Sequence, residues 1–460
     1  MQAYKRYAIP TEPAPNIVAH PNLFRVKVRK PQLAAHLLRE LVHRRGDLPV
    51  VTSRPCIYGV FSGLIGGFAP RPQFCVGCLR CTVEHHEITE IRPNPGRLRL
   101  GDSYFTPDHV DTIVYESATG HVPVRGAGYR GRFGGLGWDG MWTDMSEIVR
   151  PTRDGIHGRE FISTTVDLGE KPAFLKLSKS GEPQGKLPRL VSIEVPMLLD
   201  RAPASVESRA LYRIMSQAAQ RLSSLAIVPM PWAMGLGSTG ESVVPLVTPS
   251  QMDDLARMDA LPRLIELEGW DAAAYDYLQE QFPQALIMVR MPVTEDPLPL
   301  VRGGVRLLHL TADYHGETGD GFVLEAIRRI HDSLVSEGVR ELITLLGSGG
   351  IIAADHVAKA IVCGLDAVAL DTPLLVSLQA AFDGECLDAA TAKVRLPSFG
   401  EAWAVQRLLN LFASWRDQML EILGAMGLRE VRRLRGEIGR AMFQRELARE
   451  AFADIVGYED

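Results

Sequence analysis

Three cysteines within seven residues are the groups of this chain with the clearest chemical potential. Cys75, Cys78 and Cys81 follow the spacing C-x2-C-x2-C, with which ferredoxins turn three thiolates in a tight loop onto three irons of one cluster. A ferredoxin would place its fourth cysteine where this chain has His85, followed by His86. Because that fourth cysteine serves the other cluster of two-cluster ferredoxins, its replacement favours a single 4Fe–4S cluster.

The fourth ligand of such a cluster must come from elsewhere in the chain. Cys56, in the run Arg-Pro-Cys-Ile, is the predicted ligand. Two alternatives remain open: His85 or His86 could complete the cluster, or Cys56, two cysteines of the triplet and a histidine could hold zinc. Unligated thiols are a third alternative.

A second group of candidate residues follows two apolar runs near the end of the chain. The first run ends in Ser348, Gly349 and Gly350 and leads into a predicted helix, and the second ends in Asp371 and Thr372. Glycines let the backbone close on an anion, and a helix N-terminus adds partial positive charge. The two runs in this order predict a site for the phosphate of flavin mononucleotide (FMN).

Two further run ends carry polar groups. Arg290 ends the run that we number as strand four, and it is expected to face the flavin pyrimidine; a salt bridge on the rim is the alternative. The following polar loop contains Tyr314, His315 and Glu317, which are the candidates for substrate binding and proton transfer. His315 is preferred because imidazole exchanges protons near neutral pH, although a solvated turn or a packing role would also explain it.

The elements that must position these residues alternate between strands and helices. From about residue 190, short apolar runs alternate with helical periods, which is typical of a parallel sheet. Seven or eight such units in about 200 residues favour a closed (β/α)8 barrel. The predicted strands are 190–197, 225–229, 264–267, 285–289, 305–310, 341–346 and 367–370, and the predicted helices are 207–222, 272–281, 323–338 and 353–363.

The predicted domains are an N-terminal iron–sulfur domain (1–150), an FMN-binding barrel (151–400) and a C-terminal helical extension that packs on the barrel (401–460). Before residue 150, only 32–44 shows a sustained helical period. The glycine-rich stretch 124–138 resembles a phosphate-binding loop, but it opens no clear helix. An irregular crossing between domains is the favoured interpretation of that stretch.

Composition limits the class of protein. The chain has 460 residues, 46% hydrophobic and 23% charged, as in ordinary globular enzymes. A net charge of −5 gives no reason to expect nucleic acid or an anionic membrane as a partner. Six cysteines do not form a disulfide framework in a chain of this length, and no signal peptide or membrane-spanning run is visible. A cytoplasmic location is expected.

These motifs resemble the flavin-binding synthase domain of the glutamate synthase family, especially its archaeal-type, single-domain members. The family pattern His-Asp-Gly-Gly-Thr-Gly resembles 314–319, Asp-Gly-Gly resembles 348–350, and Asn-Thr-Gly-Glu resembles 238–241. The family lysine after strand four falls on Arg290, and 421–428 resembles the helix that closes the family domain. Archaeal-type members similarly carry a ferredoxin-like segment before the barrel.

The chain also departs from the family pattern. The three cysteines that hold a three-iron cluster after strand eight are missing, since Cys386 stands alone. The family Lys-Pro-Gly loop is replaced by 266–270, and neither a glutaminase domain nor a Met-Cys start is present. Ammonia from glutamine would therefore have to come from another subunit.

The resemblance implies an FMN- and iron–sulfur-dependent oxidoreductase that acts on a 2-oxo acid, an imine or an amino acid-like substrate. An alternative is a subunit of an amino-group transferase complex, such as an N-methylglutamate synthase, with a glutaminase-like or electron-donor partner. A third is a non-catalytic electron-transfer or assembly subunit. An oligomer or hetero-complex is expected in each case.

Overall fold

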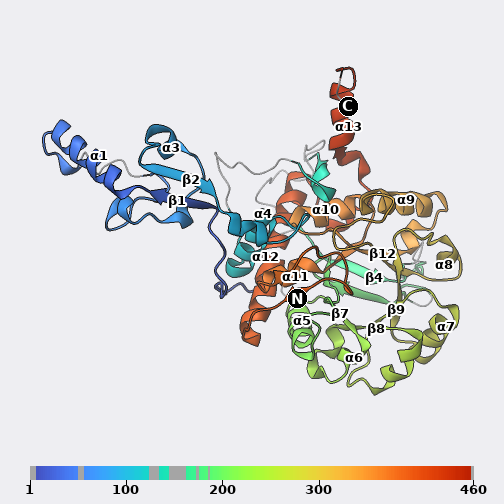
Figure 1. Ribbon diagram of the computed structural model, residues 1–460. Helices are drawn as coiled ribbons and strands as arrows, with labels where there is room; N and C mark the ends of the chain where they lie inside the picture. Colours follow the sequence, from blue (N-terminus) through green and yellow to red (C-terminus); the bar gives the residue numbers. More distant parts are fainter. Residues whose placement is uncertain are drawn as a thin grey trace. The chain divides into compact units, whose positions relative to one another are not determined.

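The computed structural model describes residues 7–49, 56–123, 134–144, 162–171, 176–184 and 187–456. The chain forms two compact units, a small one of residues 18–102 and a large one of residues 1–17 and 103–460 (Figure 1). The small unit thus ends at residue 102, whereas the predicted domain extended to residue 150. Most of the glycine-rich stretch 124–138 lies outside the described residues.

The large unit is built on a closed barrel of eight parallel strands (Figure 1). β13 pairs with β6, which closes the ring. The predicted (β/α)8 barrel is therefore confirmed. Its strands are β6 (Met197–Leu199), β7 (Ala226–Pro229), β8 (Val243–Val247), β9 (Leu264–Glu268), β10 (Leu286–Pro292), β11 (Leu307–Thr311), β12 (Thr344–Ser348) and β13 (Ala367–Leu370).

The helices between these strands follow the predicted periods closely. The longer ones are α5 (Arg209–Arg221), α7 (Ala272–Gln281), α9 (Val323–Ser336) and α10 (Ala354–Val362), and the shorter ones are α6 (Met230–Ala233), α8 (Leu298–Arg302) and α11 (Thr372–Ser377). Two of these helices begin at an N-cap residue whose side chain accepts a backbone hydrogen bond. Ser208 accepts from the Leu211 N–H at the start of α5, and Asp271 accepts from the Ala274 N–H at the start of α7.

The strand predictions need two corrections. β8 was missed, because Pro245 interrupts its apolar run and proline is rare within sheets. Arg290 consequently lies on the fifth strand, β10, and not on the fourth. The predicted run 190–197 contains β5 (Leu190–Ile193), which lies outside the barrel, and reaches only the first residue of β6.

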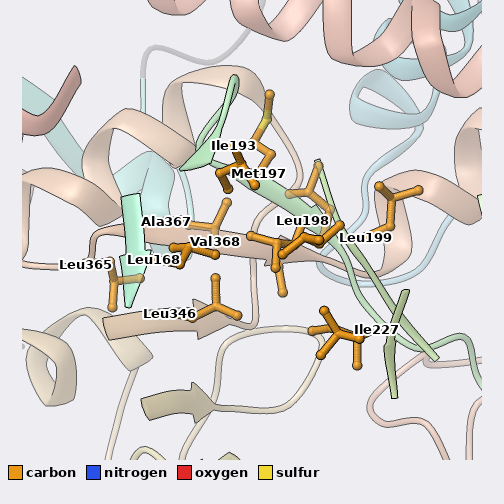
Figure 2. Close-up of a cluster of buried hydrophobic side chains, with 14 of the residues drawn as sticks. Leu168, Ile193, Met197, Leu198, Leu199, Ile227, Leu346, Leu365, Ala367 and Val368 are labelled. Atoms are coloured by element: carbon orange, nitrogen blue, oxygen red, sulfur yellow. The ribbon is translucent and has the colours of Figure 1, made fainter. Parts of the chain in front are cut away.

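A hairpin of β4 (Val166–Gly169) and β5 covers the end of the barrel where the strands begin. The backbone of Gly169 exchanges two hydrogen bonds with the side chain of Thr344, the first residue of β12. Figure 2 shows Leu168 and Ile193 of the hairpin in the same cluster of buried side chains as residues of the barrel strands, among them Met197 and Ala367. Parallel barrels carry their active sites at the opposite end, where the strands finish, so the functional site is expected there.

Two long helices pack together beside the barrel. α12 (Glu401–Ala425) is the predicted C-terminal helix, whereas α4 (Pro107–Thr119) was not predicted. Trp415 on α12 donates from Nε1 to Glu116 of α4 at 2.9 Å, and both side chains are buried. A short helix, α13 (Gln444–Phe452), follows near the end of the chain. No helix among the described residues is long and apolar enough to cross a membrane.

The small unit has a thin core. Its two-stranded sheet pairs β1 (Phe24–Val28) with β2 (Thr89–Pro93) in antiparallel fashion, flanked by α1 (Lys30–His43) and α3 (Arg80–Glu84). Among its described residues, the buried apolar side chains are Val60, Cys75 and Ile88. Units of this size with so little core usually depend on a metal, disulfides or a partner for stability.

Candidate active site and cysteine site

Polar and charged side chains gather at or just before the ends of the barrel strands, and each is at most 9% exposed. Six barrel strands contribute to this group through their last residues or the positions that follow them. Burial of this many polar groups has a cost that only hydrogen bonds, ion pairs or a ligand can offset. We call the group the strand-end cluster: Asp200, Glu266, Arg290, His309, Ser348, Asp371 and Thr372.

Arg290 forms a bidentate ion pair inside the barrel. Its two terminal nitrogens lie 2.9 Å from the two carboxylate oxygens of Asp200, and one of them lies 3.4 Å from Glu266. Burial alone would raise the pKa of Asp200, but the Arg290 guanidinium holds that pKa well below its usual range. Arg290 is therefore not a rim residue, and its partner Asp200 was not foreseen.

His309 and Glu266 form a second buried pair. His309 Nδ1 lies 2.6 Å from Glu266 Oε1, and His309 Nε2 lies 3.2 Å from Ser348 Oγ. The other carboxylate oxygen of Glu266, Oε2, has no hydrogen-bond partner. Neither residue was predicted, although each is a polar side chain with apolar neighbours on both sides in its strand, which indicates an inward-facing polar position.

Asp371 is the acid of this cluster whose pKa is raised. Burial, together with the nearby carboxylate of Asp200, raises its pKa to about 7 against opposing hydrogen bonds from Thr372. The Thr372 N–H donates to the Asp371 side chain, which caps α11. The buried Thr372 hydroxyl has no hydrogen-bond partner, so it is available to a ligand.

The three predicted catalytic residues have different surroundings. Tyr314 is buried, its hydroxyl has no hydrogen-bond partner, and the carboxylates of Asp371 and Asp200 raise its pKa in addition to burial. His315 is buried among aromatic rings, stacked on that of Tyr104. Glu317 is exposed. Tyr314 is thus in electrostatic contact with two carboxylates of the strand-end cluster.

The predicted phosphate turn is tightly packed. A Cβ atom on Gly349 would lie 2.8 Å from Ala312 Cβ, and φ is +118° at Gly349 and +69° at Gly350, so both positions favour glycine. The Gly350 N–H already donates to the Tyr314 carbonyl at 3.2 Å. The Thr372 hydroxyl, by contrast, has no partner.

The cysteine site lies in the small unit. Burial raises the pKa of the Cys75 and Cys81 thiols. The neighbouring thiols raise these two pKa values further, so each of the two thiols lies within electrostatic range of the other predicted ligands, which include Cys56 and Cys78. The Gly77 N–H bonds to the Cys75 sulfur. Four thiols are soft ligands that suit an iron–sulfur cluster or zinc.

The loop conformation explains why these cysteines converge. Gly77 has φ +69° and Leu79 has φ +60°, so the chain turns sharply between the cysteines. A side chain at Gly77 would collide with the Phe24 ring, 2.2 Å from the nearest atom. His85, the alternative fourth ligand, has its ring centroid 4.5 Å from that of His36. Cys56 thus lies within electrostatic range of Cys75 and Cys81, whereas the His85 ring lies beside that of His36.

Comparisons with known proteins support the family resemblance. The closed barrel, with polar side chains at the C-terminal ends of its strands, places the chain in the class of (β/α)8-barrel enzymes. Residues 317–429 match the conserved region of glutamate synthase. The chain is thus related to glutamate synthases, and the resemblance inferred from its motifs is confirmed.

Two of these relatives cover most of the chain. An archaeal-type glutamate synthase (NADPH) of Dehalococcoides mccartyi is 24% identical over 447 residues, which cover 80% of this chain and 86% of the relative. An archaeal glutamate synthase (NADPH) of Archaeoglobus fulgidus is 22% identical over 489 residues, covering 87% and 93%. Among solved structures, a mandelate oxidase variant with benzaldehyde has a TM-score of 0.43 and 16% identity, covering 65% of this chain and 86% of its own.

Proposed function

We propose that the protein is an FMN-dependent oxidoreductase related to glutamate synthases, which interconverts an amino acid-like substrate and its 2-oxo acid or imine. The observation that carries this proposal is the strand-end cluster. It contains buried polar atoms without partners, namely Thr372 Oγ1 and Glu266 Oε2, and the Tyr314 hydroxyl lies in electrostatic contact with it, at the barrel end where ligands bind. Such atoms are expected where a ligand supplies the missing hydrogen bonds.

The residues present fit FMN at this barrel end. Thr372 and the Ser348–Gly350 turn would hold the phosphate, and Arg290 with its partner Asp200 would lie toward the ring. When bound, FMN would exchange electron pairs as hydride, and a 4Fe–4S cluster on the four cysteines would pass single electrons.

Proton transfer falls to the chain's own residues. Asp371, with a pKa of about 7, is populated in both protonation states at neutral pH, the condition for an efficient general acid or base. The Tyr314 hydroxyl, which has no partner, is placed to donate to a substrate oxygen or nitrogen. Arg201, which pairs with Glu268 at 2.8 Å and is partly exposed, offers a cation for a substrate carboxylate.

The test is cofactor content and flavin reduction. Protein purified without oxygen is expected to contain FMN and about four irons per chain, and its flavin absorbance is expected to bleach with a member of a panel of amino acids. Thr372→Val should weaken FMN binding while the fold is kept, because it removes only a hydroxyl without a partner. Ser414→Ala is the matched control, since it removes another buried hydroxyl without a partner, on α12.

Other outcomes would contradict parts of the proposal. Protein that binds no FMN, even when FMN is added in excess, would leave a non-catalytic assembly role. Activity that appears only after a glutaminase-like subunit is added, without net flavin reduction, would instead favour the amino-group transferase. Zinc in place of iron would reject the cluster but not the flavin site.

A further inference from the structure

The charge of this chain is unevenly distributed. The small unit, residues 18–102, contains thirteen Lys and Arg residues and six Asp and Glu residues, a net charge of +7. The whole chain carries −5, so all other residues together carry −12. The interpretation that net charge predicts no charged partner therefore holds for the whole chain but not for this unit.

Basic side chains line the surface of one strand of the small unit. Arg25, Lys27 and Arg29 alternate along and just beyond β1, so they share one face, and all three are exposed. Arg25 stands directly opposite Arg92 in the strand register. The next pair in the register, Lys27 and Glu90, has opposite charges, and Arg92 forms an ion pair with Glu90, which offsets part of the positive charge. With Arg25, Lys27 and Arg29 exposed, this surface still keeps an excess of positive charge, which suits a negatively charged partner.

The segment that carries the four cysteines is also rich in exposed apolar side chains. Ile57 is 87% exposed, and Leu64 is fully exposed. Single exposed apolar side chains are ordinary on a surface, whereas this segment exposes several, and these offer apolar area for a docking partner to cover. We call the exposed apolar residues of this segment the apolar rim: Ile57, Leu64, Ile65, Phe74, Val76, Leu79 and Val83.

We infer that the small unit is the docking site for an acidic protein that carries a one-electron redox group. Its positive charge steers the acidic partner, and the apolar rim around the cysteines provides the contact. This inference deepens the proposed function, because it rests on an iron–sulfur cluster at the cysteines. One electron leaves the reduced centre of the partner and enters the oxidised cluster, and no bond or proton is involved.

The test measures binding of a defined probe to the full chain. The probe is a plant-type 2Fe–2S ferredoxin, a small acidic one-electron protein, titrated by calorimetry at low and at physiological salt. Unmodified protein is expected to bind it, and a rise to about 0.3 M NaCl should weaken binding about ten-fold or more through screening. Arg25→Glu with Lys27→Glu should weaken binding about ten-fold at low salt, whereas Arg329→Glu, an exposed position of α9, should not.

The apolar rim has its own variant and control. Ile57→Ser with Val76→Ser should weaken binding at every salt concentration, because both side chains are exposed and their loss removes contact area rather than core. Leu261→Ser, which is 71% exposed in the large unit, is the matched control. Equal ferredoxin binding by the rim variant and the control would overturn the rim as the contact.

Further outcomes separate this inference from its competitors. Tight, salt-sensitive binding of duplex DNA or anionic vesicles to the same basic residues, without ferredoxin binding, would overturn it. Salt-dependent self-association that the Arg25→Glu and Lys27→Glu changes abolish would assign the surface to a second copy of this chain. If ferredoxin binds as expected but the protein holds no iron, the docking site stands and the proposed cluster fails.

Discussion

Replacing Asp371 with asparagine should make the protein more stable above neutral pH. Burial and the Asp200 carboxylate raise the pKa of Asp371 from 3.8 to about 7, so between these values the native state binds a proton that the unfolded state has lost. The contribution of Asp371 to the free energy of unfolding is therefore fully present below about pH 4 and is lost as the pH rises to about 7. An asparagine side chain at this position cannot ionise and keeps an oxygen for the Thr372 N–H.

The magnitude follows from the shift. About three pKa units at 1.36 kcal/mol each correspond to about 4 kcal/mol lost between pH 4 and pH 7. Between pH 5 and pH 8 the native protein should lose about 3 kcal/mol through this group. The free energy of unfolding of Asp371→Asn, relative to the unmodified protein, should therefore rise by about 3 kcal/mol from pH 5 to pH 8.

Urea unfolding at several pH values, followed by tryptophan fluorescence, measures this difference. Comparing the variant with the unmodified protein cancels the titration of groups that the two share. Asp320→Asn, an exposed carboxylate in the loop before α9, serves as the control and should follow the unmodified protein. If Asp371→Asn and the unmodified protein show parallel pH profiles, the carboxyl group is not held protonated and the reasoning is wrong.

Three further predictions test other parts of the structure. Asp200→Asn should destabilise the protein by about 3–5 kcal/mol in urea unfolding, because the buried Arg290 guanidinium loses its bidentate partner and keeps only the more distant Glu266 carboxylate; an unchanged midpoint would contradict the buried ion pair. Gly77→Ala should lower metal content, measured by elemental analysis, because the new Cβ collides with Phe24, and full metal content would show that the loop tolerates a side chain there. Tyr314→Phe should slow substrate-driven flavin reduction about 100-fold while His315→Asn changes it little in stopped-flow absorbance; the reverse order would restore His315 as the proton-transfer residue.

Much of the fold could be predicted because its elements have strong local signals. Apolar runs bounded by helical periods identified six of the barrel's eight strands, and a seventh run, 190–197, reached only the first residue of β6. The strand that was missed, β8, contains Pro245, which removes a hydrogen-bond donor. Helix α4 was missed because its buried positions, among them Val110 and Ile113, are separated by polar residues. Local sequence patterns do not reveal which helix such a narrow apolar face will contact.

The candidate site could be predicted only in part, for a different reason. Ser348 and Thr372 follow apolar strands and could be recognised by position. Asp200, however, gains its meaning from Arg290, ninety residues later, and His309 from Glu266 on another strand. Such pairs form only when the barrel closes, and the spacing of residues within one segment of the sequence does not indicate which strands will then be neighbours. His315, which was chosen for its residue type, lies among aromatic rings, and its proton-transfer role stays a prediction.

The charges of the strand-end cluster couple the proposed flavin site to protons. Asp200, Glu266 and Asp371 are three buried acids, whereas Arg290 is the single permanently charged cation among the seven residues. An anionic phosphate at Thr372 would add negative charge next to Asp371 and favour its protonated form. Binding of FMN should therefore be linked to uptake of a proton, so its affinity should fall as the pH rises above about 7. In the Asp371→Asn variant this pH dependence should disappear while binding itself remains, which separates the electrostatic role of Asp371 from any direct contact with the cofactor.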